Sequence, residues 1–270
     1  MSKLTSLLMA KPGKKLRLDE IDPSFTHGYD DKEKANAKLE ENLEKLAALQ
    51  YRLYAEGKRA LLIVLQGIDA GGKDGTIRRV MTSFNPQGVN VTSFKVPAGE
   101  EKSHDYLWRI HKAIPPFGGV GIFNRSHYEE VLVVRVHNLV PKAVWSKRYD
   151  QINAFEEMLA DSGVKIVKFF LYIDKEEQKK RFTERLEDPE KNWKFSAADL
   201  EERKFWPEYT EAYEEAISRC SKKHAPWYVI PANRKWFRNF AVSEILVDTL
   251  ESMDLQYPKA APGLDKISFE

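Results

Sequence analysis

Residues 67–74 form a glycine-rich run, Gly-Ile-Asp-Ala-Gly-Gly-Lys-Asp, that ends in a lysine and an aspartate. The spacing fits the Walker A pattern of a phosphate-binding loop except at the last position, where Asp74 replaces Ser or Thr. In such a loop, backbone N–H groups and the N-terminus of the next helix converge on phosphate oxygens, and Lys73 adds a point charge. A glycine-rich turn without a ligand is the alternative. The predicted phosphate-binding residues of the loop are Gly71, Gly72, Lys73, Asp74 and Gly75.

Two aspartates lie inside this loop. Carboxylates beside a chain of phosphates repel it at close range, so Asp69 and Asp74 make sense only if cations lie between them and the bound anion. The pair therefore predicts a magnesium site. Because aspartate is also a favoured helix cap, a purely structural role for Asp74 at the start of the next helix is the competing interpretation.

A second polar cluster, residues 121–130, follows the third predicted strand, where a Walker B carboxylate would lie. That position holds the neutral Asn124, and Glu129 or Glu130, one turn onward, could restore the carboxylate. Arg125 is placed to contact phosphate with both arms of its guanidinium. In the alternative interpretation, Asn124 only bonds the loop backbone and Glu129 faces solvent. His127 has no obvious partner, so we expect a surface or satisfied histidine.

Buried strands that alternate with helices must position these two loops. Short apolar runs predict strands at residues 60–65, 89–94, 120–123, 164–173 and 227–230. Leucines at three- and four-residue steps from Leu39 to Leu53 predict an amphipathic helix that ends at Gly57. A further helix is predicted from Gly75 to Phe84. The pattern indicates an α/β three-layer sandwich with a central parallel five-stranded sheet and helices on both sides.

Three segments stand apart from this alternation. We predict an N-terminal arm over residues 1–30, a main domain over 31–257 that carries both loops and a C-terminal tail over 258–270. A stretch at about 181–215, rich in Lys and Arg, lies between the fourth and fifth strands and predicts a helical lid that excludes water. The alternative is a pair of solvated helices.

The composition suits one soluble domain, since 42% of the 270 residues are hydrophobic and 31% are charged. Cys220 is the single cysteine, which excludes a disulfide framework, and no stretch is long and apolar enough to cross a bilayer. We therefore expect a cytoplasmic protein without membrane contact. A net charge of +2 gives no overall basic field, so a polyanion must be bound by a local groove, and nucleic acid is not an expected partner.

Five segments together resemble the second family of polyphosphate kinases, and the resemblance runs from about Leu53 to Tyr257. The segments are residues 65–75, 105–111, 123–129, 193–195 and 225–232. The resemblance implies a thymidylate-kinase-like P-loop kinase fold with a helical lid, and a homodimer or homotetramer. Many members have Asp where this sequence has Asn124, and Asn124 together with Glu129 resembles the subgroup that phosphorylates both AMP and ADP.

The resemblance also implies roles for single residues. Asp69, Lys73 and Asp74 are expected to serve phosphate and Mg²⁺, and Arg125, Arg181 and Arg185 to bind phosphate. The predicted reaction moves the terminal phosphoryl group of inorganic polyphosphate to AMP or ADP, gives ADP or ATP, and runs both ways. The predicted catalytic residues are Asp69, Lys73, Arg125 and Glu129. The predicted metal ligands are Asp69, Asp74 and Glu129, and the predicted nucleotide and phosphate contacts include Asn124.

Two rival functions share parts of this pattern. A nucleoside monophosphate kinase that uses ATP as donor would have the same fold and loop. A polyphosphate user should have a long basic track, for which the candidates are Lys58, Arg78, Arg79, Arg109, Arg125 and Lys235. A non-catalytic polyanion or RNA-binding protein would instead use exposed aromatics such as Trp227, Tyr228 and Trp236 with Arg234. We expect those aromatics to be core or interface residues.

Overall fold

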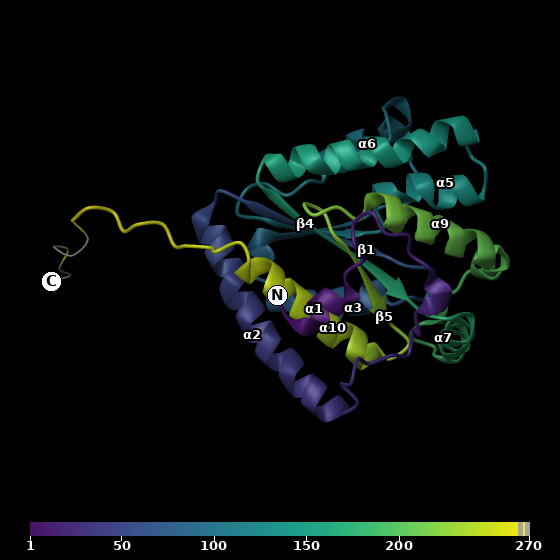
Figure 1. Cartoon of the computed structure of the whole chain (residues 1–270), viewed down its shortest axis with the longest axis horizontal. Helices are drawn as coiled ribbons and strands as arrows, with labels where there is room; N and C mark the ends of the chain where they lie inside the picture. The colour runs from purple at the N-terminus through teal and green to yellow at the C-terminus, as the bar shows by residue number, and fades with distance from the viewer. Residues whose placement is uncertain (264–266, 268–270) are drawn as a thin grey trace.

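The computed structural model describes residues 1–263 and 267. At its centre lie five parallel strands in the order β2-β3-β1-β4-β5 (Figure 1). Their bounds are β1 (Ala60–Gln66), β2 (Val89–Ser93), β3 (Val120–Asn124), β4 (Val164–Tyr172) and β5 (Trp227–Pro231). The predicted parallel five-stranded sheet is therefore confirmed, with strand ends shifted by one residue at most.

Helices cover both faces of the sheet (Figure 1). One face carries α1 (Lys3–Leu8), α2 (Lys32–Glu56), α3 (Lys73–Val80) and α10 (Lys235–Glu251). The other face carries α4 (Trp108–Lys112), α5 (Val133–Val136), α6 (Lys142–Asp161) and α9 (Trp206–Cys220). Helices α7 (Lys175–Glu187) and α8 (Ala197–Glu202) follow the carboxyl end of β4. Short 3-10 turns span Leu18–Glu20, Met81–Ser83, Pro86–Gly88, Gly99–Ser103, His127–Val131, Asn192–Lys194 and Arg203–Phe205.

The central strand β1 shows why an unbroken apolar run is required here. Leu61, Ile63 and Leu65 pack into the core beneath α2 and α10, whereas Leu62 and Val64 pack into the core beneath α6 and α9. Alternate side chains of a strand point to opposite faces, so a strand covered on both sides must be apolar at every position. Both faces of β1 are therefore buried in the core. Residues 67–72 follow its carboxyl end, at the edge of the sheet where the parallel strands end.

Helix α2 is longer than its leucine stripe predicts. Asp31 caps its start by accepting hydrogen bonds from the N–H groups of Glu33 and Lys34. Gly57 ends it in the left-handed conformation, as the sequence predicts. The stripe packs in the core, where Leu46 and Leu53 are fully buried.

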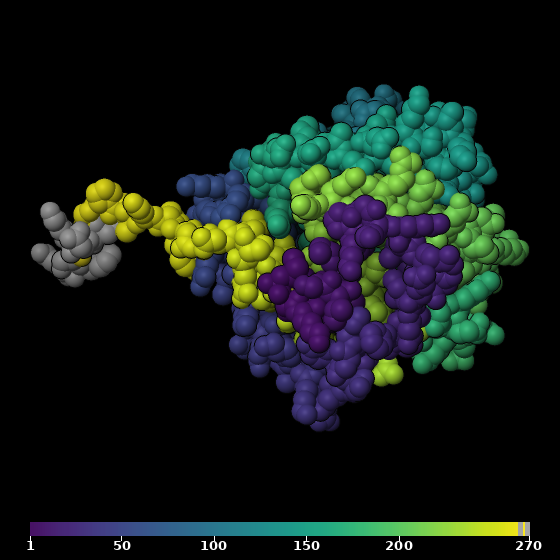
Figure 2. Space-filling view, in the orientation of Figure 1, coloured from purple at the N-terminus to yellow at the C-terminus, as the bar shows by residue number. Residues whose placement is uncertain are grey.

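The first 30 residues cross one face of the molecule (Figure 2). Leu4 and Leu8 of α1 are buried against α10 and β5, and Met9 forms an antiparallel bridge with Tyr228 of β5. This segment therefore covers the edge strand β5. At the other end of the chain, the described part of the predicted 258–270 tail extends away from the body (Figure 1), and residues 264–266 and 268–270 lie outside the described residues.

Candidate active site

The glycine-rich loop lies between β1 and α3, at the carboxyl edge of the sheet. Ala70 and Gly72 have positive φ angles, which turn the loop back over the start of α3. Lys73 is the first residue of α3, and its buried Nζ donates hydrogen bonds to the carbonyls of Gly67 (2.6 Å) and Ile68 (3.3 Å). These neutral acceptors leave the lysine charge without a close carboxylate. The loop thus holds a buried cation that lacks an anionic partner within the described part of the chain, and an anionic ligand would supply one.

Burial, and to a lesser degree the charge of Arg125, lower the pKa of Lys73 to about 8. Taking an ammonium out of water disfavours its charged form, and a neighbouring cation acts in the same direction. A phosphate bound beside Lys73 would raise this pKa again. Occupation of the loop by a polyanion is therefore coupled to the protonation of Lys73.

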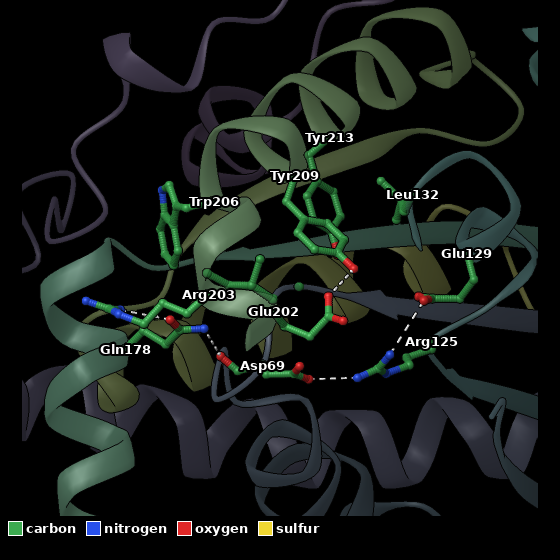
Figure 3. A pocket seen from close by; sticks show the side chains of 12 residues that line it. Asp69, Arg125, Glu129, Leu132, Gln178, Glu202, Arg203, Trp206, Tyr209 and Tyr213 are labelled. Atoms are coloured by element: carbon green, nitrogen blue, oxygen red, sulfur yellow. Dashed lines mark hydrogen bonds and ion pairs between the residues drawn. The ribbon is translucent and has the colours of Figure 1, made fainter. Parts of the chain in front are cut away.

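Arg125 is the centre of the second polar loop. It follows β3 in the left-handed conformation, with a φ of 63°, and its N–H donates to the carbonyl of Leu65 (3.0 Å). A non-glycine residue in this region is strained, and such strain is concentrated at functional sites. Its guanidinium lies between Asp69, at 2.7 Å, and Glu129, at 3.5 Å (Figure 3). The structure thus brings together three of the four predicted catalytic residues around one cation.

Asp74 has partners from two distant parts of the chain. Its carboxylate accepts a hydrogen bond from Asn124 Nδ2 (2.8 Å) and pairs with Lys194 Nζ (3.2 Å), which belongs to the predicted lid. Burial acts to raise the pKa of Asp74, but these two contacts outweigh it and lower the pKa below its usual value. The capping interpretation of Asp74 is wrong, because the N-cap residue of α3 is Gly72 and no side chain caps the helix. The idea that Asn124 bonds only the backbone is equally wrong, and so is a solvent-facing Glu129, since only 14% of its side chain is exposed.

A pocket opens beside Arg125, with an empty volume of about 470 Å³ that includes its open mouth (Figure 3). Trp206, Tyr209 and Tyr213 of α9 form one wall. The remaining lining residues are Gly67, Ile68, Asp69, Arg125, Glu129, Leu132, Gln178, Glu202 and Arg203. Within this wall, Glu202 accepts hydrogen bonds from the Tyr209 hydroxyl (2.7 Å) and pairs with His137 (3.0 Å).

Our sequence reasoning missed this aromatic wall. It weighed only the charged residues of the 181–215 stretch, although Trp206, Tyr209 and Tyr213 recur at steps of three and four residues. That spacing places all three on one face of a helix, which is the signal that could have found them. Gln178 carried no comparable signal, whereas Lys194 belongs both to the basic residues of the 181–215 stretch and to the 193–195 segment of the family resemblance.

Arg181 has a different place from the one predicted. Its side chain is buried, and each of its five N–H groups has a protein acceptor within hydrogen-bond distance. The acceptors are the Glu177 carboxylate and the carbonyls of Ala70, Gly71, Ala232 and Asn233. No donor is therefore left for phosphate. Arg181 instead connects the glycine-rich loop to the residues that follow β5. Arg185, also of α7, pairs with Asp199 of α8, at 3.5 Å.

The structure contradicts two members of the predicted basic track. Lys58 precedes β1 and so lies at the opposite edge of the sheet from the loop, and Arg109 is buried, where it donates to the carbonyl of Lys95 (2.7 Å). Both assignments are wrong for these reasons. Arg78 is exposed in the last turn of α3, Arg79 pairs with Glu40, and Lys235 pairs with Glu184. These three remain candidates.

Two further expectations concern buried side chains. Of the two expectations for His127, a surface or a satisfied histidine, the structure supports the second, because His127 is 1% exposed and its Nε2 lies 3.1 Å from Glu156 Oε1. Trp227 and Tyr228 are also buried, which excludes them as stacking platforms for RNA bases and agrees with our expectation of core residues. No helix within the described residues is long and apolar enough to cross a membrane.

The carboxylates near the loop do not form a closed metal cage, since no group of three metal-ligating side chains gathers among the residues that the structure describes. Mg²⁺ in kinase sites is usually held by one or two carboxylates, with substrate phosphates and water completing the shell. Asp69 and Asp74 flank the loop, and each already has a side-chain cation as neighbour, Arg125 and Lys194 respectively. Asp69 and Asp74 therefore fit an open Mg²⁺ site, in which substrate phosphates and water would supply the remaining ligands.

A glycine-rich loop after β1 and a polar loop after the neighbouring β3, at one edge of a five-stranded parallel sheet covered by helices on both faces, define the fold of a P-loop kinase, an enzyme of phosphoryl transfer. The family model described as "Polyphosphate kinase 2 (PPK2)" matches residues 29–258. The chain belongs to the polyphosphate kinase 2 family.

Similar proteins agree over nearly the whole chain. It is 53% identical to an AMP/ADP-polyphosphate phosphotransferase from Meiothermus ruber, over 96% of this chain and 98% of that one. It is 44% identical to an ADP-polyphosphate phosphotransferase from Rhodopseudomonas palustris, over 94% and 92% of the two chains. The crystal structure of polyphosphate kinase 2 from Arthrobacter aurescens TC1 is 44% identical, covers 96% of this chain with 93% of its own, and superposes with a TM-score of 0.92.

Proposed function

We propose that this protein transfers the terminal phosphoryl group of inorganic polyphosphate to AMP and to ADP, giving ADP and ATP, in a reversible reaction that needs Mg²⁺. The single observation that carries the proposal is the placement of Lys73 and Arg125 around one loop edge together with three carboxylates. Phosphoryl transfer needs positioning and charge stabilisation rather than a protein nucleophile. The names of the similar proteins support the two acceptors.

Each side chain then has a definite task. Lys73 leaves the loop carbonyls and binds the phosphates in transfer, while Arg125 exchanges its carboxylate partners for phosphate oxygens. Asp69, Asp74 and Glu129 would hold Mg²⁺, which when bound neutralises charge on the transferred group. Arg181 fixes the loop backbone on which these contacts depend.

The acceptor nucleotide is proposed to lie in the pocket beside Arg125. Three observations support this position: the aromatic wall suits a nucleobase, Glu202 suits its polar edge, and Arg125 and Glu129 lie at the end where phosphates would enter. Asn124 and Arg185 remain predicted phosphate contacts. A homodimer or homotetramer remains a prediction from the family resemblance.

The proposal is tested by incubating the protein with Mg²⁺, long-chain polyphosphate and AMP, with no other nucleotide present. We expect ADP to form first and ATP to follow. Lys73→Ala, prepared in the same way, controls for contaminating kinases and should form neither product at a comparable rate. Absence of both products with the parent protein would contradict the proposal.

A further inference from the structure

Arg238 presses its side chain directly against the glycine-rich loop. It lies in the second turn of α10, where its N–H donates to the carbonyl of Arg234, and it is 4% exposed. A Cβ built on Gly72 would lie 1.9 Å from Arg238 Nη1, and one built on Gly75 would lie 3.2 Å from Nη2. The guanidinium thus occupies the space that side chains at these two positions would fill.

The charge of Arg238 is not compensated. Its Nε and Nη2 both donate to the amide oxygen of Asn239, at 3.2 Å and 2.8 Å, and no carboxylate of the described residues pairs with it. Nη1 has no hydrogen-bond acceptor among those residues. Arg181, its neighbour across Gly72, is in contrast fully bonded and paired with Glu177.

This arrangement is costly without a ligand. A buried charge that lacks a partner is penalised by several kcal/mol. Burial, followed by repulsion from Arg181, lowers the pKa of Arg238 to about 10. The side chain is therefore still a cation at neutral pH. A cation held in this way beside backbone N–H groups that converge on phosphate indicates that an anion completes the site.

The position of Arg238 distinguishes between the two substrates. Arg238 does not line the pocket formed by Arg125, Glu129 and the aromatic wall of α9. It approaches the loop from α10, beside Arg181 of α7, and Lys235 lies one turn earlier on the same helix. An anion bound at Arg238 would therefore lie outside the pocket that is proposed for the acceptor nucleotide.

We propose that Arg238 binds the polyphosphate donor, through the phosphates that stay behind after the terminal group is transferred. The inference rests on the proposed function, because it assigns the donor chain to the side of the loop that faces α7 and α10. The terminal phosphate then sits over Lys73, and the rest of the chain passes Arg238 toward Lys235. Arg238 is a substrate-binding residue that the predicted basic track did not include.

Arg238→Met tests this assignment against Arg135→Met, the same change at an arginine that is 11% exposed and has carboxylate partners. Arg135 pairs with Glu215 (2.6 Å) and Glu211 (2.7 Å). Removing an unpaired cation should leave the melting temperature of the ligand-free protein unchanged or raised. Removing Arg135 should lower it, because the hydroxyl of the fully buried Tyr149 loses its hydrogen-bond partner. The two variants are thus expected to move stability in different directions.

Binding is measured by the rise in melting temperature with tripolyphosphate alone and by the half-saturating concentrations of polyphosphate and AMP. For Arg238→Met we expect the tripolyphosphate effect to fall to less than half. The half-saturating concentration of polyphosphate should rise about tenfold or more, because one hydrogen bond from a charged group is lost. The half-saturating concentration of AMP should change little. Arg238→Lys, which keeps the charge, should restore part of the tripolyphosphate effect and part of the affinity for polyphosphate. Arg135→Met should change neither.

The assignment would be overturned if Arg238→Met lowered the melting temperature as Arg135→Met does and left both polyphosphate measurements unchanged. If the methionine variant failed to fold, Arg238→Gln would replace it, and unchanged polyphosphate measurements with that neutral variant would overturn the assignment. A parent protein that responds to tripolyphosphate but forms no ADP would contradict the proposed function alone, because the melting measurement does not require turnover.

Discussion

Two buried lysines illustrate how differently this fold treats a positive charge. Lys168 of β4 is fully buried, and its Nζ donates to the Tyr128 hydroxyl (2.8 Å), the Cys220 carbonyl (2.8 Å) and the Glu156 carboxylate. Lys73 bonds only two loop carbonyls and remains partly open to ligands. The first lysine has a permanent carboxylate partner, whereas the second has neutral acceptors that a phosphate can replace. The presence or absence of a carboxylate partner therefore separates the structural Lys168 from Lys73, which we propose to be catalytic.

Lys73→Ala should produce the largest effect. Because the lysine charge acts mainly on the transition state, we expect turnover to fall roughly 10³-fold or more. The melting temperature should barely change, since no carboxylate loses a partner. Initial rates with polyphosphate and AMP, together with thermal melting, test both expectations. A variant that kept a third of the parent rate would show that the loop is not the site of transfer.

Lys168→Met should show the opposite profile. It leaves Glu156 buried without its cation, a change that typically costs about 3–5 kcal/mol. We expect a large fall in the melting temperature, while the protein that remains folded at low temperature keeps most of its turnover. Chemical denaturation measures the first effect. If Lys168→Met were as stable as the parent, the contrast between the two lysines would be lost.

Glu129→Gln probes the second loop, and a moderate effect is expected. If Glu129 supplies the carboxylate that Asn124 cannot, the variant should need more magnesium for its half-maximal rate with both AMP and ADP. Excess magnesium should restore part of the rate. Glu211→Gln, a change at an exposed carboxylate that does not line the pocket, serves as control. Superimposable magnesium titrations of Glu129→Gln and the parent would exclude a metal-binding role for Glu129.

Asn124→Asp should change the choice of acceptor more than the overall rate. The substitution adds an anion beside Asp74, where the space for charge depends on how many phosphates the acceptor carries. We therefore expect the ratio of AMP to ADP use to shift. Parallel initial rates with the two acceptors measure this ratio, and an unaltered ratio would remove Asn124 from substrate discrimination.

The pH dependence should show the smallest effect. The pKa of Lys73 is lowered from 10.5 to about 8, so between these values the unfolded chain binds more protons than the folded one. This group therefore makes stability rise with pH in that range. The value of kcat/KM should instead fall above about pH 8, because the free enzyme loses the Lys73 charge. Lys73→Arg should remove that alkaline limb, and a limb that persists in it would assign the titration to another group.

The sequence predicts best what is local. The apolar run of β1 and the glycines and lysine that follow it define strand, loop and helix within about 20 residues, and all three elements are confirmed. Arg181 and Arg185 look equivalent in the sequence. Only the fold reveals that the N–H groups of Arg181 are already bonded, two of them to carbonyls of the glycine-rich loop. The Lys194 to Asp74 pair spans 120 residues, and no local pattern encodes it. Arg238 likewise gains its meaning only through its contact with Gly72.

The most direct test of the account is a comparison of donors in a single assay. ADP formation from AMP is measured with Mg²⁺ and either polyphosphate or ATP as the only phosphoryl donor, at matched phosphate concentrations. A site built for a polyphosphate chain beside Arg238 and Lys73 predicts that polyphosphate supports the faster reaction. Rapid ADP formation with ATP, and none with polyphosphate, would contradict the account and make the protein a nucleoside monophosphate kinase.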